Sequence, residues 1–383
     1  MNRGLIALMF GGLGIGITEF VMAGLLPDLA TSLHTSIPET GNLISIYALG
    51  VVVGAPLLIL AAGKIAPRKL LILLMADFTL FNCLSAFAPN YHILLITRFL
   101  SGVPHGAYFG VGSVVASKIA KKGKESQAVS VMFAGLTFAN LIGVPVGTFI
   151  GHHFSWRYTF LLITLIGIIT MISLRYWIPE LRSTKTQGIK QDLAFFTHLD
   201  SWLIIFFISI GSAGLFAWAS YIAPMLIHLT RFNPDDISYI MAIAGVGMVL
   251  GNFVGGKLAD KYSPINTILL FMFLMSMSLI IVYFAAPYKI ATLFMIFITG
   301  AISFTIASPV QMTMIKYSKG AELLAASVSQ ASFNIGNALG AFLGGLPLFW
   351  GYNYNTPQLV GAGMALCGSM FVILLKLHIR NRN

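Results

Sequence analysis

The sequence predicts an all-α membrane protein with twelve transmembrane helices in two pseudo-symmetric six-helix bundles. Three observations lead to this expectation. The 383 residues are 57% hydrophobic and only 9% charged, whereas an ordinary soluble domain has about 25% charged residues. Twelve apolar stretches are long enough to cross a bilayer, which takes about 20 residues of helix. Ordered pairs of residues also recur at a fixed spacing of 197 positions, so the second half of the chain repeats the first.

The twelve apolar stretches divide as six plus six around a polar segment near residues 180–200. They are longer than the strands of a transmembrane barrel, so each is expected to be a helix. We therefore expect an N-terminal bundle over residues 1–181, a cytoplasmic linker over 182–200 and a C-terminal bundle over 201–383. The expected helices cover residues 4–27, 41–62, 68–88, 91–117, 127–150, 156–178, 201–229, 238–258, 264–286, 289–315, 320–346 and 356–379.

The internal repeat involves residue types with special backbone or hydrogen-bonding roles. Chance can match single glycines in a chain that has 38 of them, but it is a poor account of ordered matches that include a Pro pair and an Asn pair. Two equivalent halves in a membrane chain are typical of transporters built from parallel repeats, with substrate held between the halves. The matched pairs are Pro27 and Pro224, Gly50 and Gly247, Gly54 and Gly251, Asn140 and Asn337, Gly143 and Gly340, and Gly147 and Gly344.

The basic residues are distributed unevenly between the two expected sides of the membrane. With both termini inside, 19 of the 23 Lys and Arg residues fall on the cytoplasmic side, and only Arg157, Arg231 and Lys289 fall outside. This positive-inside asymmetry predicts a multi-pass protein of the cell inner membrane with both termini cytoplasmic. Because the net charge of +11 follows this pattern, no nucleic-acid partner is expected. The expected partners are a small-molecule substrate, protons and the lipid bilayer, and the chain is expected to be a monomer.

Several other chemistries are not supported by the sequence. Residues 251–257 match the glycine–lysine pattern of a phosphate-binding loop, but Leu258 follows instead of Ser or Thr, and the segment lies in an expected span. Cys83 and Cys367 are far apart and lack metal-ligand spacing. No metal-binding HExxH motif, nucleophile–base pair or carboxylate dyad within one span is present. We expect no metal, no cofactor and no enzymatic activity, so a membrane-embedded enzyme is the remote alternative.

Ionisable residues inside a membrane are costly and are functional candidates by default. Glu19 lies in the first span, and its repeat partner is Phe216, so this carboxyl group belongs to one half only. In a poorly hydrated cavity it could bind and release a proton during transport. Arg98 and His105 share one face of the fourth span because they are seven residues apart. Glu19, Arg98 and His105 are therefore predicted to couple transport to protons.

Each of these residues also has a purely structural interpretation. Glu19 could form a permanent ion pair with Arg98 that only holds helices together. His105 could protonate near neutral pH or hydrogen-bond a substrate, or it could be a packing residue. Asp77, in the third span, has few polar neighbours in the sequence, so a local interhelical hydrogen bond is the expected role of its carboxyl group.

Two groups of residues are predicted to face the substrate. Ser327, Gln330, Asn334 and Asn337 form a stripe along the eleventh span at steps of three, four and three, and Asn140 mirrors Asn337 in the fifth span. The stripe either lines the central cavity or joins helices. The seventh span carries aromatic residues that could stack on a sugar ring or an apolar drug, or pack at the membrane interface. They are Phe216, Trp218 and Tyr221.

The sequence resembles a major facilitator superfamily transporter of the bacterial drug:proton antiporter branch, and within it the arabinose and sugar-efflux proteins. The most specific segment is residues 98–112, RFLSGVPHGAYFGVG, which matches the Arg-x-x-x-Gly motif of the fourth span and the Pro-His-Gly-Ala sequence of the sugar-efflux proteins. Thr18-Glu19-Phe20 resembles the first span of the branch, and residues 155–160 resemble the start of its sixth span. Gly143, Pro145 and Gly147 resemble a shortened antiporter motif and are predicted gating residues, because proline bends a helix.

The gating loop of the family is preserved in only one half of the chain. Gly256, Lys257 and Asp260 match it after the eighth span, whereas residues 63–69 after the second span contain no acid. The cytoplasmic gate is therefore expected to depend mainly on Asp260. The resemblance implies that Glu19 carries the proton and that Arg98 modulates it. Together these features predict a proton-coupled antiporter that exports a sugar or drug by alternating access. A proton-coupled sugar symporter or a uniporter is the alternative.

Overall fold

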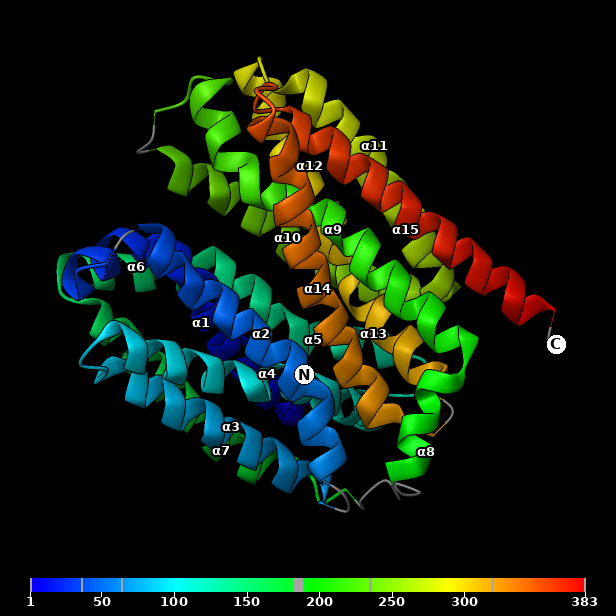
Figure 1. The fold of residues 1–383 in the computed structure, drawn as a ribbon. Coiled ribbons are helices and arrows are strands. Elements are labelled where there is room, and N and C mark those ends of the chain that lie inside the picture. The colour runs from blue at the N-terminus through cyan, green and yellow to red at the C-terminus, as the bar shows by residue number, and fades with distance from the viewer. Residues whose placement is uncertain are drawn as a thin grey trace. The chain divides into compact units, whose positions relative to one another are not determined.

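The computed structural model describes residues 2–35, 37–62, 65–181, 189–233, 236–318 and 320–381, and within these ranges the regular secondary structure is helical (Figure 1). Each of the twelve expected spans corresponds to a helix or to two or three consecutive helical segments, which confirms the predicted fold class. The segments are α1 (Arg3–Leu33), α2 (Ile37–Ala62), α3 (Pro67–Ala86), α4 (Tyr91–Ile119), α5 (Glu125–Phe138), η1 (Ala139–Gly143), α6 (Val144–His153), α7 (Trp156–Trp177), α8 (Ile189–Ala194), η2 (Phe195–Thr197), α9 (Leu199–His228), α10 (Ile237–Tyr262), α11 (Pro264–Ala285), α12 (Lys289–Thr305), α13 (Ala307–Lys316), α14 (Glu322–Phe349) and α15 (Thr356–Arg380).

Ten spans in the described part of the chain are long and apolar enough to cross a membrane by composition alone. The two spans outside this group are α4 and α14. Helix α4 contains Arg98 and His105, and α14 contains the polar stripe from Ser327 to Asn337. A helix with so many polar groups is costly to expose to lipid, so its polar side chains need protein or water around them.

Local sequence explains where many of these helices begin. Asn90 and Ser155 cap α4 and α7, because their side-chain oxygens accept hydrogen bonds from the free backbone amides of the first helical turn. Proline stands at the first turn of α3, α11 and α15, where its missing N–H group has no cost.

Two predicted helices are less regular than expected. The fifth span contains a π-helical turn, η1, which ends two residues before Pro145, and the tenth span is divided between α12 and α13 at Ile306, three residues before Pro309. A proline ring clashes with the carbonyl group four residues earlier and removes one backbone hydrogen bond. A wide turn or a break upstream of the proline relieves that clash, so the bend expected at Pro145 takes the form of a π-helical turn, while the interruption at Ile306 was not predicted.

The chain forms two compact units. Unit 1 comprises residues 1–121, 131–193 and 319–331, and unit 2 comprises residues 122–130, 194–318 and 332–383. The start of α5 therefore groups with the second unit, and the start of α14 groups with the first. Each unit is described below by itself.

The repeated glycines have the same packing role in both units. In unit 1, a Cβ atom on Gly50 or Gly54 of α2 would collide with the carbonyl oxygen of Phe99 or Val103 of α4. In unit 2, the matching Gly247 and Gly251 of α10 face the carbonyl oxygens of Phe297 and Ala301 of α12 in the same way. Only glycine permits such close approach of two backbones. The repeat seen in the sequence thus encodes the same helix crossing twice.

This contact gives a prediction for stability. Gly251→Ala is expected to destabilise the protein by about 1–3 kcal/mol, because the added methyl group overpacks the contact with α12. Thermal unfolding in detergent, followed by loss of the monodisperse peak in size-exclusion chromatography, measures the effect. The matched control is Gly363→Ala in α15, where a Cβ atom would meet nothing within 4 Å. Equal midpoints for both variants would contradict the crossing described here.

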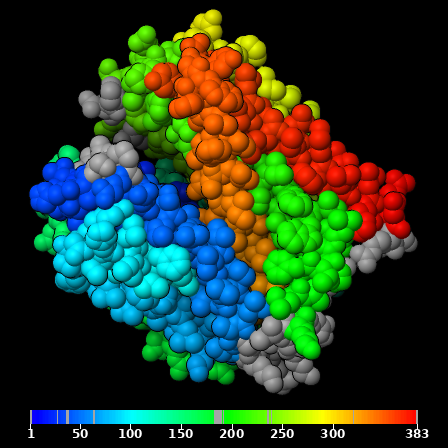
Figure 2. Space-filling model, in the orientation of Figure 1, coloured from blue at the N-terminus to red at the C-terminus, as the bar shows by residue number. Residues whose placement is uncertain are grey.

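The outer surface of the helices is apolar. Helix α15, the red helix in Figure 2, carries exposed side chains on one side and buried ones on the other. Large apolar side chains at 40% exposure or more would be costly in water but are the normal lipid-facing surface of a membrane helix. On α15 they are Leu359, Leu366, Met370, Ile373, Leu374 and Leu377.

Candidate functional site

The centre of the candidate site is Arg98, a fully buried residue of α4 in unit 1. Its Nη1 atom donates a hydrogen bond of 3.0 Å to the Thr18 hydroxyl, and its Nε atom donates one of 3.4 Å to the Leu43 carbonyl oxygen. The guanidinium carbon lies 4.3 Å from the centroid of the Tyr47 ring, a cation–π distance. A permanent charge at this depth is tolerable only with such partners.

The network around Arg98 continues to neighbouring helices. Thr18 of α1 donates a hydrogen bond of 2.7 Å to the side-chain oxygen of Asn82 in α3, and Asn82 donates to the Phe78 carbonyl oxygen at 2.8 Å. In the other direction, the Tyr47 hydroxyl of α2 lies 3.0 Å from Nδ1 of His105 in α4. Four helices of unit 1 thus contribute side chains to one buried polar network that contains both Arg98 and His105.

Glu19 does not form the ion pair with Arg98 that was its structural interpretation. No salt bridge between them is present among the described residues, and the Thr18 hydroxyl takes the place expected for the carboxylate. Adjacent helical residues point about 100° apart, so the Thr18 side chain, which accepts from Arg98, and the Glu19 side chain leave α1 in different directions. The half-buried Glu19 is nevertheless within electrostatic reach of Arg98. The Nη2 atom of Arg98 is buried and has no hydrogen-bond partner in the described part of the chain.

Sequence reasoning missed Thr18, Tyr47 and Asn82. It selected ionisable groups because a charge in a membrane is costly, and these three side chains are polar but uncharged at neutral pH. Thr18 directly precedes Glu19, and Asn82 is an amide within an apolar span, so both offered a weak signal. Asp77, by contrast, is half-buried on α3 and makes no hydrogen bond or ion pair within the described ranges. The hydrogen bond expected for Asp77 is therefore absent there.

The polar stripe of α14 is divided between the two units. Gln330 is buried in unit 1, where its Cβ atom would lie 3.4 Å from a Cβ atom placed on Gly106, the residue after His105. Asn334 is buried and Asn337 is half-buried, and both belong to unit 2. Asn140 lies in η1 of unit 1 and donates a hydrogen bond of 3.1 Å to the Leu136 carbonyl oxygen. Of these predicted substrate-lining residues, Gln330 is the one placed beside the Arg98–His105 helix.

The three aromatic residues of α9 have packing contacts within unit 2. Trp218 is fully buried in an apolar cluster with Met225 and Leu279. The Tyr221 hydroxyl donates a hydrogen bond of 2.7 Å to the Ala341 carbonyl oxygen. Phe216 packs against α14, since its Cβ atom would lie 2.8 Å from a Cβ atom on Gly340. Burial and packing are thus the observed environment of Trp218, while Phe216 and Tyr221 remain partly exposed.

The predicted gating residues of α10 contact the first turns of α5, and both segments belong to unit 2. The Asp260 carboxylate accepts hydrogen bonds from the backbone amides of Ser126 and Gln127, at 2.8 and 3.0 Å, and from the Gln127 side chain at 3.0 Å. Asn252, fully buried, donates to the Ser130 carbonyl oxygen at 2.7 Å. Gly256 lies between Asn252 and Asp260 along α10, and its missing side chain leaves room for the first turns of α5. The Lys257 side chain is exposed.

Asp260 therefore caps a helix N-terminus. The free amides and the positive end of the helix dipole at the start of α5 favour a carboxylate at this position. Asn252, Gly256 and Asp260 follow one another at steps of four, so they form one stripe along α10. In the fifth span, Gly143 and Gly147 pack against Ile17 and Val21 of α1, which places the antiporter-like segment on the helix that carries Glu19.

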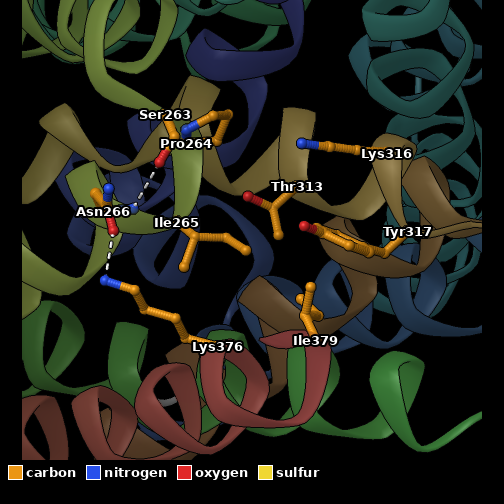
Figure 3. Close-up of a pocket in the computed structure, with 9 residues that line it drawn as sticks. All are labelled: Ser263, Pro264, Ile265, Asn266, Thr313, Lys316, Tyr317, Lys376 and Ile379. Carbon is orange, nitrogen blue, oxygen red and sulfur yellow. Dashed lines mark hydrogen bonds between the residues drawn. The ribbon is translucent and has the colours of Figure 1, made fainter. Parts of the chain in front are cut away.

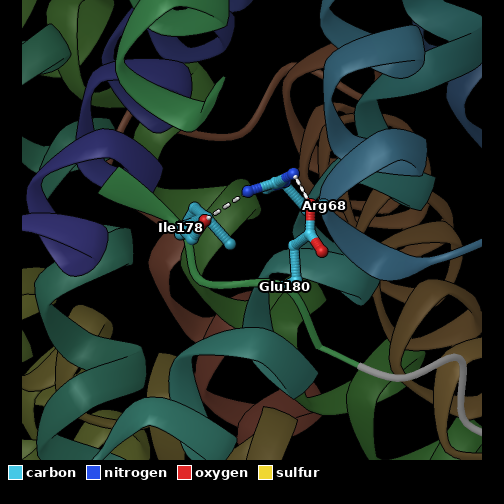
Figure 4. A network of polar contacts seen from close by, with 3 residues as sticks. All are labelled: Arg68, Ile178 and Glu180. Carbon is cyan, nitrogen blue, oxygen red and sulfur yellow. Dashed lines mark hydrogen bonds and ion pairs between the residues drawn. The ribbon is translucent and has the colours of Figure 1, made fainter. Parts of the chain in front are cut away.

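Two polar features lie away from Arg98. In unit 1, Arg68 forms an ion pair with Glu180 and donates to the Ile178 carbonyl oxygen at 3.4 Å (Figure 4). Arg68 lies in the first turn of α3 and within residues 63–69, the segment that lacks the family acid. Gly63 and Lys64 of that segment lie outside the described residues. In unit 2, a pocket of about 220 Å³ opens between α11, α13 and α15, with Lys376 donating to Asn266 at 2.9 Å and Lys316 at its edge (Figure 3).

Comparisons with known proteins agree with this architecture. The Major Facilitator Superfamily matches residues 8–323 and 202–382. The inner membrane transport protein YdhP of Escherichia coli (strain K12) is 39% identical over 369 residues, which cover 96% of this chain and 95% of that protein. A protein of Mannheimia succiniciproducens named "Probable sugar efflux transporter" is 30% identical over 88% of this chain and 85% of its own length.

Solved structures show the same fold at lower sequence identity. The E. coli fucose:proton symporter FucP superposes with a TM-score of 0.80 at 12% identity, covering 98% of this chain and 99% of that one. The proton:xylose symporter XylE superposes with a TM-score of 0.77 at 16% identity, covering 96% and 94%. The twelve helices, the repeated glycine crossings and the family match over most of the chain together show that it belongs to the Major Facilitator Superfamily, whose members are transporters and not enzymes.

Proposed function

We propose that this transporter exports a small hydroxylated molecule of the sugar class across the bacterial inner membrane in exchange for protons. The observation that supports proton coupling is the buried Arg98, which is hydrogen-bonded to Thr18, lies within reach of Glu19 and has no carboxylate paired with it among the described residues. Relatives named as sugar efflux and inner membrane transport proteins support the substrate class and the membrane.

The proposed coupling follows from the needs of the buried guanidinium group. A deprotonated Glu19 carboxylate can neutralise Arg98 and accept a hydrogen bond from its free Nη2 atom. When Glu19 takes up a proton, that attraction is lost, and the Arg98 network is held by Thr18, Leu43 and Tyr47 alone. A proton arriving from outside thereby changes the interactions between α1 and α4, and substrate binding can depend on that change.

The test of this function is transport in liposomes. Purified protein is reconstituted, a pH gradient is imposed, and the movement of radiolabelled sugars and of a drug panel is followed. We expect sugar to move against the direction of proton movement, together with substrate-dependent proton flux. Movement in the same direction as protons would establish a symporter, and sugar flux that is independent of pH would establish a uniporter.

Asp260→Asn is expected to loosen the start of α5 and to slow turnover. The variant removes the negative charge that caps the helix, an effect of about 0.3–1 kcal/mol and up to ~2 kcal/mol in buried geometry. Hydrogen–deuterium exchange of the peptide covering residues 122–130 should become faster, and cysteines on the proposed cytoplasmic side should become more accessible. Lys261→Gln, an exposed charge one residue later, is the control. Unchanged exchange at 122–130 would leave Asp260 without a gating role.

The proposed orientation is also testable. With both termini and the 182–200 linker cytoplasmic, a cysteine at Asn233, which is exposed, should react with an impermeant reagent from outside. A cysteine at Ser183, which lies outside the described residues, should react only after the membrane is permeabilised. Both variants are made in a background without Cys83 and Cys367. Labelling of both positions from outside would reverse or break the proposed topology.

A further inference from the structure

Tyr47 of α2 is in contact with both functional candidates of α4. Its ring centroid lies 4.3 Å from the guanidinium carbon of Arg98, and its hydroxyl lies 3.0 Å from Nδ1 of His105. The side chain is only 2% exposed. Tyr47 therefore fills the space between two α4 residues that are seven positions apart, and it couples their positions through one rigid ring.

The backbone around Tyr47 leaves it little freedom to move. A Cβ atom on Gly102, which lies between Arg98 and His105, would collide with the carbonyl oxygen of Tyr47 itself. One turn further along α2, Gly50 makes the same close approach to Phe99. With the two backbones in contact on both sides, the ring position is set by the helix crossing. The hydroxyl is thus directed at His105 by the fold and not by a flexible side chain.

A neutral histidine has one N–H group and one acceptor nitrogen, and the partner of one nitrogen determines the role of the other. Nε2 of His105 has no hydrogen-bond partner in the described part of the chain, although the side chain is 2% exposed. If the Tyr47 hydroxyl donates to Nδ1, the proton must reside on Nε2. A phenol usually serves as the donor to an imidazole, since its own proton otherwise has no acceptor at this site.

We propose that Tyr47 holds His105 in the Nε2–H tautomer, so that Nε2 donates a hydrogen bond to a hydroxyl oxygen of the transported molecule. Tyr47 is then a positioning residue, and His105 contacts substrate. This inference rests on the proposed function for its substrate class, a polyol. Of the two functional roles that the sequence left open for His105, proton binding and a hydrogen bond to substrate, it assigns the second, and it leaves proton binding to Glu19. Gln330, packed beside Gly106, is in a position to add a second polar contact.

The tautomer itself can be measured without any transport assay. Protein carrying ¹⁵N-labelled histidine is placed in lipid nanodiscs, and the Nδ1 and Nε2 shifts of His105 are identified by comparison with His105→Gln, since the chain has eight histidines. We expect the Nε2–H pattern in the wild type and a shift toward a tautomer mixture in Tyr47→Phe. That variant keeps the ring on Arg98 and removes only the hydroxyl. An Nδ1–H pattern in the wild type, or an unchanged spectrum in Tyr47→Phe, overturns the proposal.

Substrate affinity provides the second readout. Tyr47→Phe is expected to raise the KM for sugar exchange by about three- to tenfold, the effect of one neutral hydrogen bond, with little change in kcat. The matched control is Tyr108→Phe, which removes a buried hydroxyl from α4 that donates to the Leu8 carbonyl oxygen at 3.3 Å and is not bonded to His105. Equal KM changes in both variants would reduce Tyr47 to a packing residue. If Tyr47→Phe does not fold, the tautomer of His105 measured in the wild-type protein decides whether the proposal stands.

The two readouts separate this inference from the proposed function. A wild-type protein that moves no sugar would reject the proposed function, while the spectrum would still report whether Tyr47 fixes the tautomer. A wild-type protein that exchanges sugar but shows the Nδ1–H tautomer would retain the function and reject the inference.

Discussion

Arg98→Lys is expected to reduce transport by about tenfold or more, equivalent to at least ~1.4 kcal/mol, while the protein remains folded. Lysine keeps the positive charge but places its N–H donors on one nitrogen, so it cannot reproduce the separate Nη1 and Nε positions from which Arg98 contacts Thr18 and the Leu43 carbonyl oxygen, and it has no plane to stack on Tyr47. The charge would remain buried with fewer partners, which weakens the link between α1, α2 and α4. Exchange flux in liposomes and thermal unfolding in detergent measure the two effects.

The control for this variant is Arg157→Lys. Arg157 belongs to the same unit, stacks on Trp156 at 4.1 Å and donates to the Ala88 carbonyl oxygen at 2.8 Å, but it is only half-buried. Its replacement should therefore change stability slightly and leave transport intact. Wild-type exchange by Arg98→Lys would show that charge alone is sufficient at position 98 and that the hydrogen-bond geometry is not needed.

The sequence was sufficient to predict the helices and the repeat, and the structure shows which helices the repeated glycines bring together. Apolar length determines the spans, and paired glycines such as Gly54 and Gly251 identify places where backbones touch. The interruption at Ile306 could have been predicted from Pro309, because proline clashes with the carbonyl group four residues before it. The π-helical form of η1 could not, since the same clash can be relieved by a kink, a break or a wide turn.

The sequence predicted the charged residues of the candidate site but not the side chains that they contact. Arg98 and His105 were recognisable from cost and spacing, but the partners Thr18, Tyr47 and Asn82 come from three other helices. Which side chains face Arg98 depends on how each helix is rotated about its own axis. The type of a single residue does not indicate this rotation. The same applies to Asp260, whose partners Ser126 and Gln127 are more than 130 residues away in sequence.

Glu19→Gln is expected to abolish transport driven by a pH gradient. The amide has nearly the same shape as the protonated carboxyl group but cannot release a proton, so α1 would be held in the state that follows proton uptake. Glu19 is the only acid among the described residues of unit 1 that is within electrostatic reach of Arg98. The variant also removes the negative charge within electrostatic reach of Arg98, so only the uncharged Thr18 hydroxyl and the Leu43 carbonyl oxygen remain to stabilise the buried guanidinium group.

The assay that isolates this role compares two modes of transport in the same liposomes. Sugar uptake driven by a pH gradient should be lost in Glu19→Gln, whereas exchange of labelled for unlabelled sugar at equal pH on both sides should continue. Binding of sugar to the wild type should vary with pH, and this dependence should disappear in the variant. A variant that loses both modes would instead have lost substrate binding or folding, which thermal unfolding distinguishes.

Asp77→Asn is the matched control, because Asp77 is the other membrane-embedded acid of unit 1 and has no hydrogen bond within the described ranges. Asp77 lies on α3 and takes part in none of the contacts that Arg98 makes with α1 and α2. Asp77→Asn should therefore retain transport driven by the pH gradient. If Glu19→Gln still responds fully to the gradient and Asp77→Asn does not, the driving proton binds in α3, and the buried Arg98 network serves to hold the helices together.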